Sequence, residues 1–184
     1  MPRRPGEPRG DEEKTKTESG AGANPAPPQL LGVHFHTGAA APLHPQLKTL
    51  LTFWSAKRGS RPVPARADLP VYELKPWFGQ VALLESALGT FRFRLSGVGL
   101  IPRLGCDATG LTLADLAPDL RKPLMALLDL ASSRAEPAAS ATVLRFEGRR
   151  MLWSDLMLPL AGGRSTRPLL IFGSYPVDPA DGPS

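Results

Sequence analysis

Apolar and polar residues alternate strictly from residue 91 to residue 96. Successive side chains of a β-strand point to opposite faces of the sheet, so this alternation is typical of a strand with one buried and one exposed face. The pattern predicts that Phe91, Phe93 and Leu95 share the buried face. Gly97 and Gly99 then end the strand.

Further segments have the composition of strands. Residues 80–88 precede the alternating segment, and Gly89 joins the two in a predicted hairpin. Three more candidates follow late in the chain, at residues 138–146, 150–160 and 168–175. A short apolar stretch at residues 29–36 can add another strand.

The clearest helical pattern lies at residues 45–58. Its apolar residues recur at intervals of three and four, which places them on one face of a helix. These residues are Leu47, Leu50, Leu51 and Trp54. Proline at position 45 suits a first helical turn, and Gly59 suits a helix end. We therefore expect an amphipathic helix with a single apolar stripe.

A second helical stripe lies between the alternating segment and the last three candidate strands. It consists of Leu120, Leu124, Leu127, Leu128 and Ala131. Pro123 fits only the first turn of this helix, because further inside it would remove a hydrogen bond and clash with the preceding turn. The order of two strands, a helical insert and three strands predicts an α+β fold with a five-stranded antiparallel sheet.

Several ordered motifs accompany these elements. They are W-x-x-x-R-G at residues 54–59, P-x-R-x-D at 64–68, F-R-x-R-L-x-G at 91–97, G-x-D-x-T-G at 105–110 and x-L-P-L at 157–160. Together the motifs resemble PAS domains, in particular a bacterial family of small, often single-domain PAS proteins known mainly from alphaproteobacteria. The resemblance covers roughly residues 43 to 176. It implies a helical insert between the second and third strands of the sheet, and an amphipathic helix before them.

With this resemblance the chain divides into four parts. Residues 1–28 are rich in proline, glycine and charge, so we expect a disordered tail. An extension with the amphipathic helix follows at residues 29–61. The PAS domain itself spans residues 62–176, and residues 177–184 form a flexible end.

The resemblance also implies a sensory cavity between the sheet and the helical insert, which can hold a small apolar ligand. Its candidate lining residues are Phe93, Leu95, Leu104, Leu113, Leu124, Leu128, Leu144, Trp153 and Ile171. A solid core built from the same residues is the competing interpretation. Flanking helices of PAS proteins often pack on a second copy, which makes Leu47, Leu50, Leu51 and Trp54 candidate contacts with a dimer or another signalling partner. Packing of these four residues on their own domain is the alternative.

The identity of a cofactor stays unknown from the sequence, but two groups are disfavoured. Haem is disfavoured because His34, His36 and His44 all precede the helical insert, where PAS domains bind it. Photoactive flavin is disfavoured because light-sensing relatives have a cysteine soon after the glycine that corresponds to Gly110, whereas Cys106 precedes that glycine. His34 and His36 would share a face of a strand, but no third metal ligand lies near them in the sequence, so we expect no metal site.

Charge and composition add further expectations. The chain of 184 residues carries a net charge of +5, and its basic residues are scattered rather than clustered. Nucleic acid is therefore not expected as a partner, although a basic nucleic-acid-associated module remains an alternative. No stretch reaches the roughly 18 apolar residues of a membrane span, and the N-terminus lacks an export signal, so we expect a cytoplasmic protein without membrane contact.

The sequence favours a binding protein over an enzyme. It contains no nucleophile elbow, Walker loop, dinucleotide fingerprint or H-E-x-x-H motif. The neighbouring Asp107 should raise the pKa of the thiol of Cys106, so a reactive thiolate is not expected. We predict a non-catalytic sensory or protein-interaction module. A small-molecule enzyme that uses Cys106 or a histidine is the remaining alternative.

Overall fold

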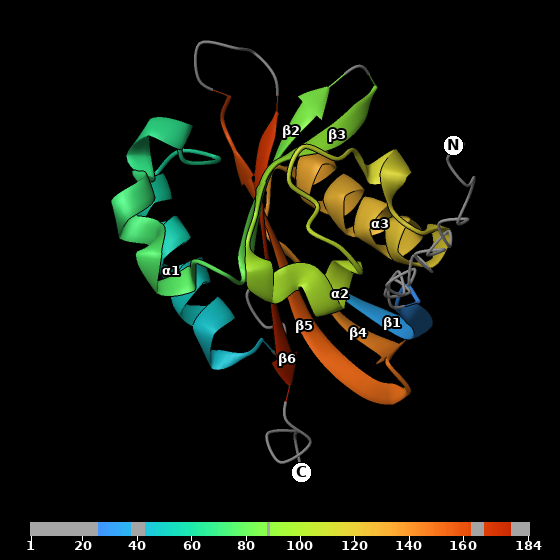
Figure 1. Ribbon diagram of the computed structural model, residues 1–184. Coiled ribbons are helices and arrows are strands. Elements are labelled where there is room, and N and C mark those ends of the chain that lie inside the picture. The colour runs from blue at the N-terminus through green and yellow to red at the C-terminus, as the bar shows by residue number, and fades with distance from the viewer. Residues whose placement is uncertain (1–25, 38–42, 88, 163–167, 178–184) are drawn as a thin grey trace, which may run out of the picture.

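A computed structural model describes residues 26–37, 43–87, 89–162 and 168–177. Figure 1 shows one twisted sheet with α1 on one face and α2 and α3 on the other. The predicted tails at residues 1–28 and 177–184 fall almost entirely outside the described residues.

All paired strands run antiparallel, in the order β1-β4-β5-β6-β2-β3. The strands are β1 (Gln29–Thr37), β2 (Val81–Ala87), β3 (Thr90–Ser96), β4 (Ala138–Phe146), β5 (Arg149–Leu160) and β6 (Leu169–Val177). The five predicted strands correspond to β2, β3, β4, β5 and β6, and they occur in the predicted order along the chain. The sheet has six strands rather than five, because the apolar stretch before α1 adds β1 beside β4.

The helices fall into two groups, one on each face of the sheet. Before the hairpin come α1 (Pro45–Arg58) and the 3-10 helices η1 (Arg66–Asp68) and η2 (Val71–Trp77). The insert between β3 and β4 contains η3 (Val98–Leu100), α2 (Ile101–Leu104), η4 (Leu113–Asp115) and α3 (Pro118–Arg134). The predicted α+β fold and the position of the helical insert are thereby confirmed. The prediction that Pro123 lies in the first turn of α3 is wrong, because the helix already begins at Pro118 and Pro123 lies inside it. No helix among the described residues is long and apolar enough to cross a membrane.

The prediction that Leu95 lies on the buried face of β3 is wrong. Leu83 and Leu84 of β2 are neighbours, but they pair with Leu95 and Phe93, so Arg94 is an extra residue in β3. Such a bulge shifts the alternation by one residue. As a result Phe93 is buried under the insert, whereas Leu95 is 50% exposed.

The apolar stripe of α1 lies against the outer face of β5 and β6. Leu47 and Leu50 are fully buried there, and the indole Nε1 of Trp54 donates a hydrogen bond to the carbonyl oxygen of Pro159 at 2.9 Å. Gly173 of β6 permits this close approach, since a Cβ at its position would lie 2.8 Å from Leu47 Cδ2. We refer to this side of the sheet as the α1 face, and to the other as the insert face.

The G-x-D-x-T-G motif folds over the free edge of β3. The carboxylate of Asp107 accepts a hydrogen bond from the amide of Thr109, and the hydroxyl of Thr109 accepts one from the amide of Ser96. The amide of Gly110, whose φ of +83° favours glycine, donates to the carbonyl oxygen of Phe93 at 2.7 Å. The motif therefore positions the insert over the sheet.

Gly97 offers a test of this packing. A Cβ at its position would lie 2.4 Å from backbone atoms of Gly79, which no side-chain rotation can relieve. We expect Gly97→Ala to lower the free energy of unfolding by about 1–3 kcal/mol, as for other overpacked sites. Equilibrium urea unfolding would measure the loss. Gly32→Ala is the matched control, since no atom lies within 4 Å of its Cβ position, and equal stability of the two variants would contradict the prediction.

Candidate functional site

A buried ion pair lies between the insert and the centre of the sheet. Arg103 comes from α2 and Asp155 from β5, and their side chains are 1% and 0% exposed. The guanidinium donates from Nη2 to Oδ2 of Asp155 at 2.8 Å and from Nε to Oδ1 at 3.1 Å. Two parallel hydrogen bonds of this kind fix both the distance and the orientation of the two groups.

Three hydroxyl groups complete the surroundings of the Asp155 carboxylate. The hydroxyl of Thr142 donates to Oδ2 at 2.6 Å, that of Ser140 to Oδ2 at 3.2 Å, and that of Ser174 to Oδ1 at 2.5 Å. Ser140 and Ser174 are the direct cross-strand neighbours of Asp155 on β4 and β6. Three adjacent strands thus contribute to one polar centre, which we call the Asp155 cluster.

The electrostatics of the Asp155 cluster favour the ionised carboxylate. Burial alone would raise the pKa of Asp155, but the charge and hydrogen bonds of Arg103, with those of Ser174 and Thr142, outweigh it and hold the pKa below its usual value of 3.8. A carboxylate with a lowered pKa stabilises the fold above its unfolded-state pKa, and this contribution is lost as the pH falls through the folded-state value. At neutral pH the ion pair is fully formed.

Two buried hydrogen-bond donors near the cluster have no partner among the described residues. They are Nη1 of Arg103 and the indole Nε1 of Trp153. Trp153 lies two residues before Asp155 on β5 and therefore on the same face of the sheet. Buried donors normally find an acceptor, either in the protein or in an ordered water. The interior under the insert therefore combines apolar walls with N–H groups that an acceptor atom can satisfy.

Most of the predicted cavity residues are buried on the insert face. They are Phe93, Leu104, Leu113, Leu124, Leu128, Leu144 and Trp153. Leu95 and Ile171 do not join them. Leu95 is turned outward by the bulge at Arg94, and Ile171 packs on the α1 face with the stripe of α1.

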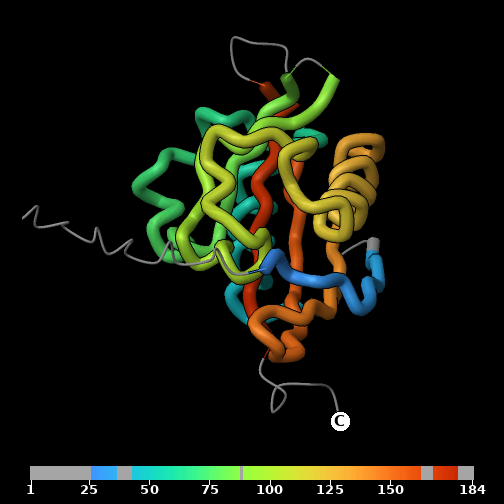
Figure 2. Tube along the Cα trace, turned by 45° about the vertical axis from the view of Figure 1, so that its right-hand side comes forward, coloured from blue at the N-terminus to red at the C-terminus, as the bar shows by residue number. Residues whose placement is uncertain are grey.

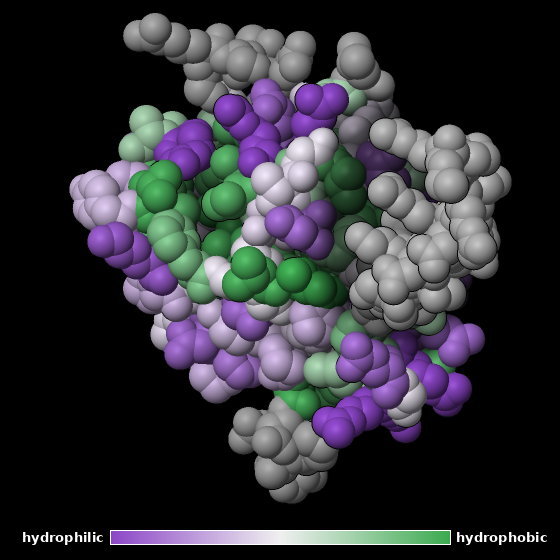
Figure 3. Space-filling view, viewed as in Figure 1, coloured by the Kyte–Doolittle hydropathy of each residue, from purple (hydrophilic) through white to green (hydrophobic). Residues whose placement is uncertain are grey.

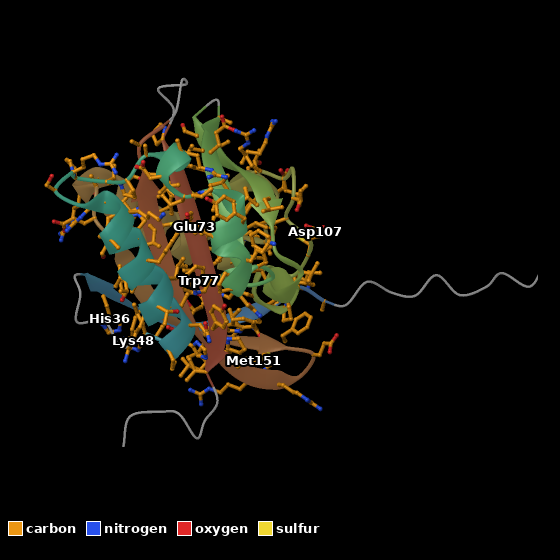
Figure 4. The ribbon with its side chains drawn as sticks, turned by 90° about the vertical axis from the view of Figure 1, so that its left-hand side faces the viewer. His36, Lys48, Glu73, Trp77, Asp107 and Met151 are labelled. Atoms are coloured by element: carbon orange, nitrogen blue, oxygen red, sulfur yellow. The ribbon has the colours of Figure 1, made fainter. Side chains whose placement is uncertain are left out.

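The four candidate dimer contacts of α1 lie against its own sheet. Leu47, Leu50 and Trp54 are buried, and Leu51 is partly buried in the same cluster. Figure 4 shows Trp77, the last residue of η2, beside α1, where its indole Nε1 donates to the carbonyl oxygen of Gln46 at 2.9 Å. The stripe is therefore occupied within the chain while α1 stays docked.

An apolar groove opens on the α1 face between η2 and the β2–β3 hairpin. Its volume is about 50 Å³, and its lining residues are Arg66, Val71, Leu74, Phe78, Val81, Ala82, Leu83, Leu95 and Ile171. Val71, Phe78 and Leu95 are exposed despite their apolar side chains. Arg66 is the one charged residue of this lining. We call this feature the η2 groove.

More exposed apolar residues lie beside the η2 groove. Tyr72 follows Val71 on η2, and Val98 lies close by because Gly97 and Gly99 pack against residues 79 and 80. Figure 3 shows apolar surface gathered over η2 and over the η3–α2 segment. Scattered exposed apolar residues are ordinary, but a gathered patch marks a binding surface.

The residues considered for chemistry come from different segments: Cys106 follows α2, His34 and His36 lie on β1, and His44 precedes α1. Burial and then the charge of Asp107 raise the pKa of the Cys106 thiol, which is the direction expected from the sequence. Within the described part of the chain, no three histidine, cysteine, aspartate or glutamate side chains lie together as metal ligands. His34 and His36 are on β1, and the ring of His44 stacks on Tyr175 at 4.7 Å.

The Asp155 cluster was not predicted from the sequence. Arg103 is one of the scattered basic residues there, and Asp155 has no predicted role. A usable signal was present, because Asp155 is the one charged residue in the stretch from 151 to 160, where every other residue except Ser154 is apolar. A charge at such a position requires a buried partner. The sequence does not reveal which cation supplies it.

Removal of Arg103 tests the cluster. Arg103→Met leaves the Asp155 carboxylate buried without its counter-charge, and losses of about 3–5 kcal/mol are typical when one partner of a buried pair is removed. In this variant, the contribution of Asp155 to the free energy of unfolding should also depend on pH in the opposite sense. Burial then raises the pKa of Asp155, so stability should increase as the pH is lowered toward 4, where the wild type begins to lose the contribution of this carboxylate.

Urea unfolding between pH 4 and pH 7 would measure both effects. Arg121→Met is a suitable control, because the half-buried side chain of Arg121 on α3 donates to the carbonyl oxygen of Ala114 and forms no ion pair among the described residues. A loss for Arg103→Met no larger than that of the control would show that the ion pair does not stabilise the fold.

Comparison with known proteins agrees with this architecture. Residues 43–175, more than half of the chain, match the family described as the PAS domain. Searches among curated proteins and among solved structures gave no significant match. The matched range includes α1 and all strands except β1. The chain therefore belongs to the PAS domain family, as its motifs predicted.

Proposed function

We propose that this chain is a non-catalytic sensory module of the cytoplasm that signals by binding another protein through the η2 groove. Membership of the PAS domain family supports a sensory or interaction role. The observation that carries the proposal is the gathering of exposed apolar side chains around the groove, namely Val71, Tyr72, Phe78, Leu95 and Val98. Leaving such a surface in water costs free energy that a bound partner recovers.

The charges near the η2 groove indicate the chemistry of the partner. Arg66 lines the groove and Lys75 is exposed on η2, whereas Arg94, beside Leu95, forms an ion pair with Glu85 at 3.3 Å. We therefore infer a partner segment with an apolar anchor and acidic residues on either side of it. Such complementarity mainly favours fast and specific association.

A path for a signal runs through one strand of the sheet. The guanidinium of Arg103 lies 5.9 Å from the centre of the Phe172 ring on the insert face of β6. The next residue back along the strand, Ile171, forms part of the η2 groove on the opposite face. A change of packing under the insert, such as a ligand that binds the free donors of Arg103 and Trp153, would therefore act on the groove across a single strand. Two packings of β6 with different affinities for the partner would suffice.

Photo-crosslinking in the cells that make the protein tests this role. A benzophenone amino acid at Tyr72, beside the groove, should yield an adduct of one defined mass. The same group at Met125 should not, although Met125 is also an exposed apolar residue. Leu95→Asp, a change at a half-exposed position, should abolish the adduct at position 72 by placing a carboxylate in the groove.

Equal adducts from positions 72 and 125, or none from either, would contradict the proposal. Unfolding measurements on Leu95→Asp would exclude loss of the fold as the cause of a missing adduct.

A further inference from the structure

The two edges of the sheet differ in how they are protected. Exposed backbone N–H and C=O groups at an edge can pair with another strand, and natural proteins block this with charges, prolines, bulges or covering segments. β3 uses three of these devices, namely Arg92 and Arg94, the bulge at Arg94, and the segment that bonds to its edge at Phe93. β3 is therefore a closed edge.

The other edge, β1, carries fewer of these devices. Its nine residues include no aspartate, glutamate, lysine, arginine or proline. The register shift at Leu31 affects only its start, and from Gly32 onward it pairs regularly with β4. Among the described residues, no backbone hydrogen bond joins the outer side of β1 to another segment. Figure 2 shows β1 as the outermost strand, beside β4.

β1 also lies outside the part of the chain that matches the PAS domain family. The family match begins at residue 43, after β1 has ended. Without β1, β4 would be the edge strand of the sheet. β1 covers β4, but the outer edge of β1 is itself unprotected. The unprotected edge therefore lies in the segment before the matched PAS domain.

We propose that β1 pairs with β1 of a second copy, in antiparallel fashion, so that two sheets join into one. The occupant is a second copy because the strand is complementary to itself. Pairing centred on His34 places Val33 opposite Phe35 of the second copy, and the two-fold axis generates the same pair twice. Val33 and Phe35 both lie on the insert face, as their partners Thr142 and Ser140 show. Aromatic and β-branched residues are a favourable cross-strand pair.

The remaining pairs fit the same register. Gly32 faces His36 of the second copy, so the small residue accommodates the imidazole, and His34 faces its own copy at the axis. No pair brings together two residues of like fixed charge, because the strand has none. Phe35 is 38% exposed in the single chain and would become covered.

The proposed dimer leaves the η2 groove free. β1 and β3 are opposite edges of the sheet, and Figure 4 shows His36 of β1 and Asp107 beside β3 on opposite sides of the molecule. A dimer through β1 would thus present two grooves to partners. The proposal does not depend on the function of the groove, so either can fail without the other.

Sedimentation equilibrium of the purified full-length protein is the first test. We expect a dimer whose dissociation constant rises about tenfold or more with Phe35→Lys, because the change removes two apolar pairs and adds charge beside the axis. Tyr72→Lys, at another exposed aromatic residue, should leave the dissociation constant unchanged. A wild-type protein that stays monomeric throughout the micromolar range would overturn the proposal.

Cysteine cross-linking tests the register without disturbing the apolar pair. In a Cys106→Ser background, His34→Cys should form an intermolecular disulfide, because residue 34 faces itself across the axis within the Cα separation of about 4.4–6.8 Å that a disulfide requires. His36→Cys, on the same strand and the same face, should not, because it faces Gly32 of the second copy. Equal cross-linking of both variants, or none at position 34, would overturn the register and the pairing.

Discussion

The ion pair of Arg103 and Asp155 is the constraint on which the arrangement of the two layers depends. Asp155 lies on a central strand and is fully buried. Its carboxylate therefore needs hydrogen-bond donors from the insert as well as from the neighbouring strands. Neighbouring strands supply hydroxyl groups, and among the described residues Arg103 is the one that supplies the opposite charge. α2 has only four residues, of which Leu104 is buried in the apolar cluster of the insert face. The buried guanidinium of Arg103 adds a charged contact between α2 and the sheet.

The two faces of the sheet consequently have different characters. On the α1 face, aliphatic and aromatic side chains pack against a helix that is attached by apolar contacts and the Trp54 hydrogen bond. On the insert face, an apolar cluster surrounds a polar centre with two donors left over. In the proposed function, an acceptor group would bind inside the insert face, and a partner protein would bind the η2 groove on the α1 face. Sensing and partner binding would then be divided between the two sides of one sheet.

The sequence predicted what depends on local patterns. The stripe of α1, the hairpin, the order of the strands and the position of the insert follow from periodicity and turn residues, because these act over a few neighbouring positions. The bulge at Arg94 escaped prediction, since alternation continues in the sequence while the backbone shifts by one residue. The partner of Asp155 escaped as well, because Arg103 lies 52 residues away and only the closed fold brings the two together. The groove depends on the same bulge, which turns Leu95 outward.

Native-state hydrogen exchange on wild type and Asp155→Asn would test most directly whether this ion pair holds the insert on the sheet. The account predicts that amides of residues 97–116 lose protection selectively in the variant, while those of α1, which docks on the other face, keep theirs. Uniform loss of protection across both segments, or none in the insert, would contradict it.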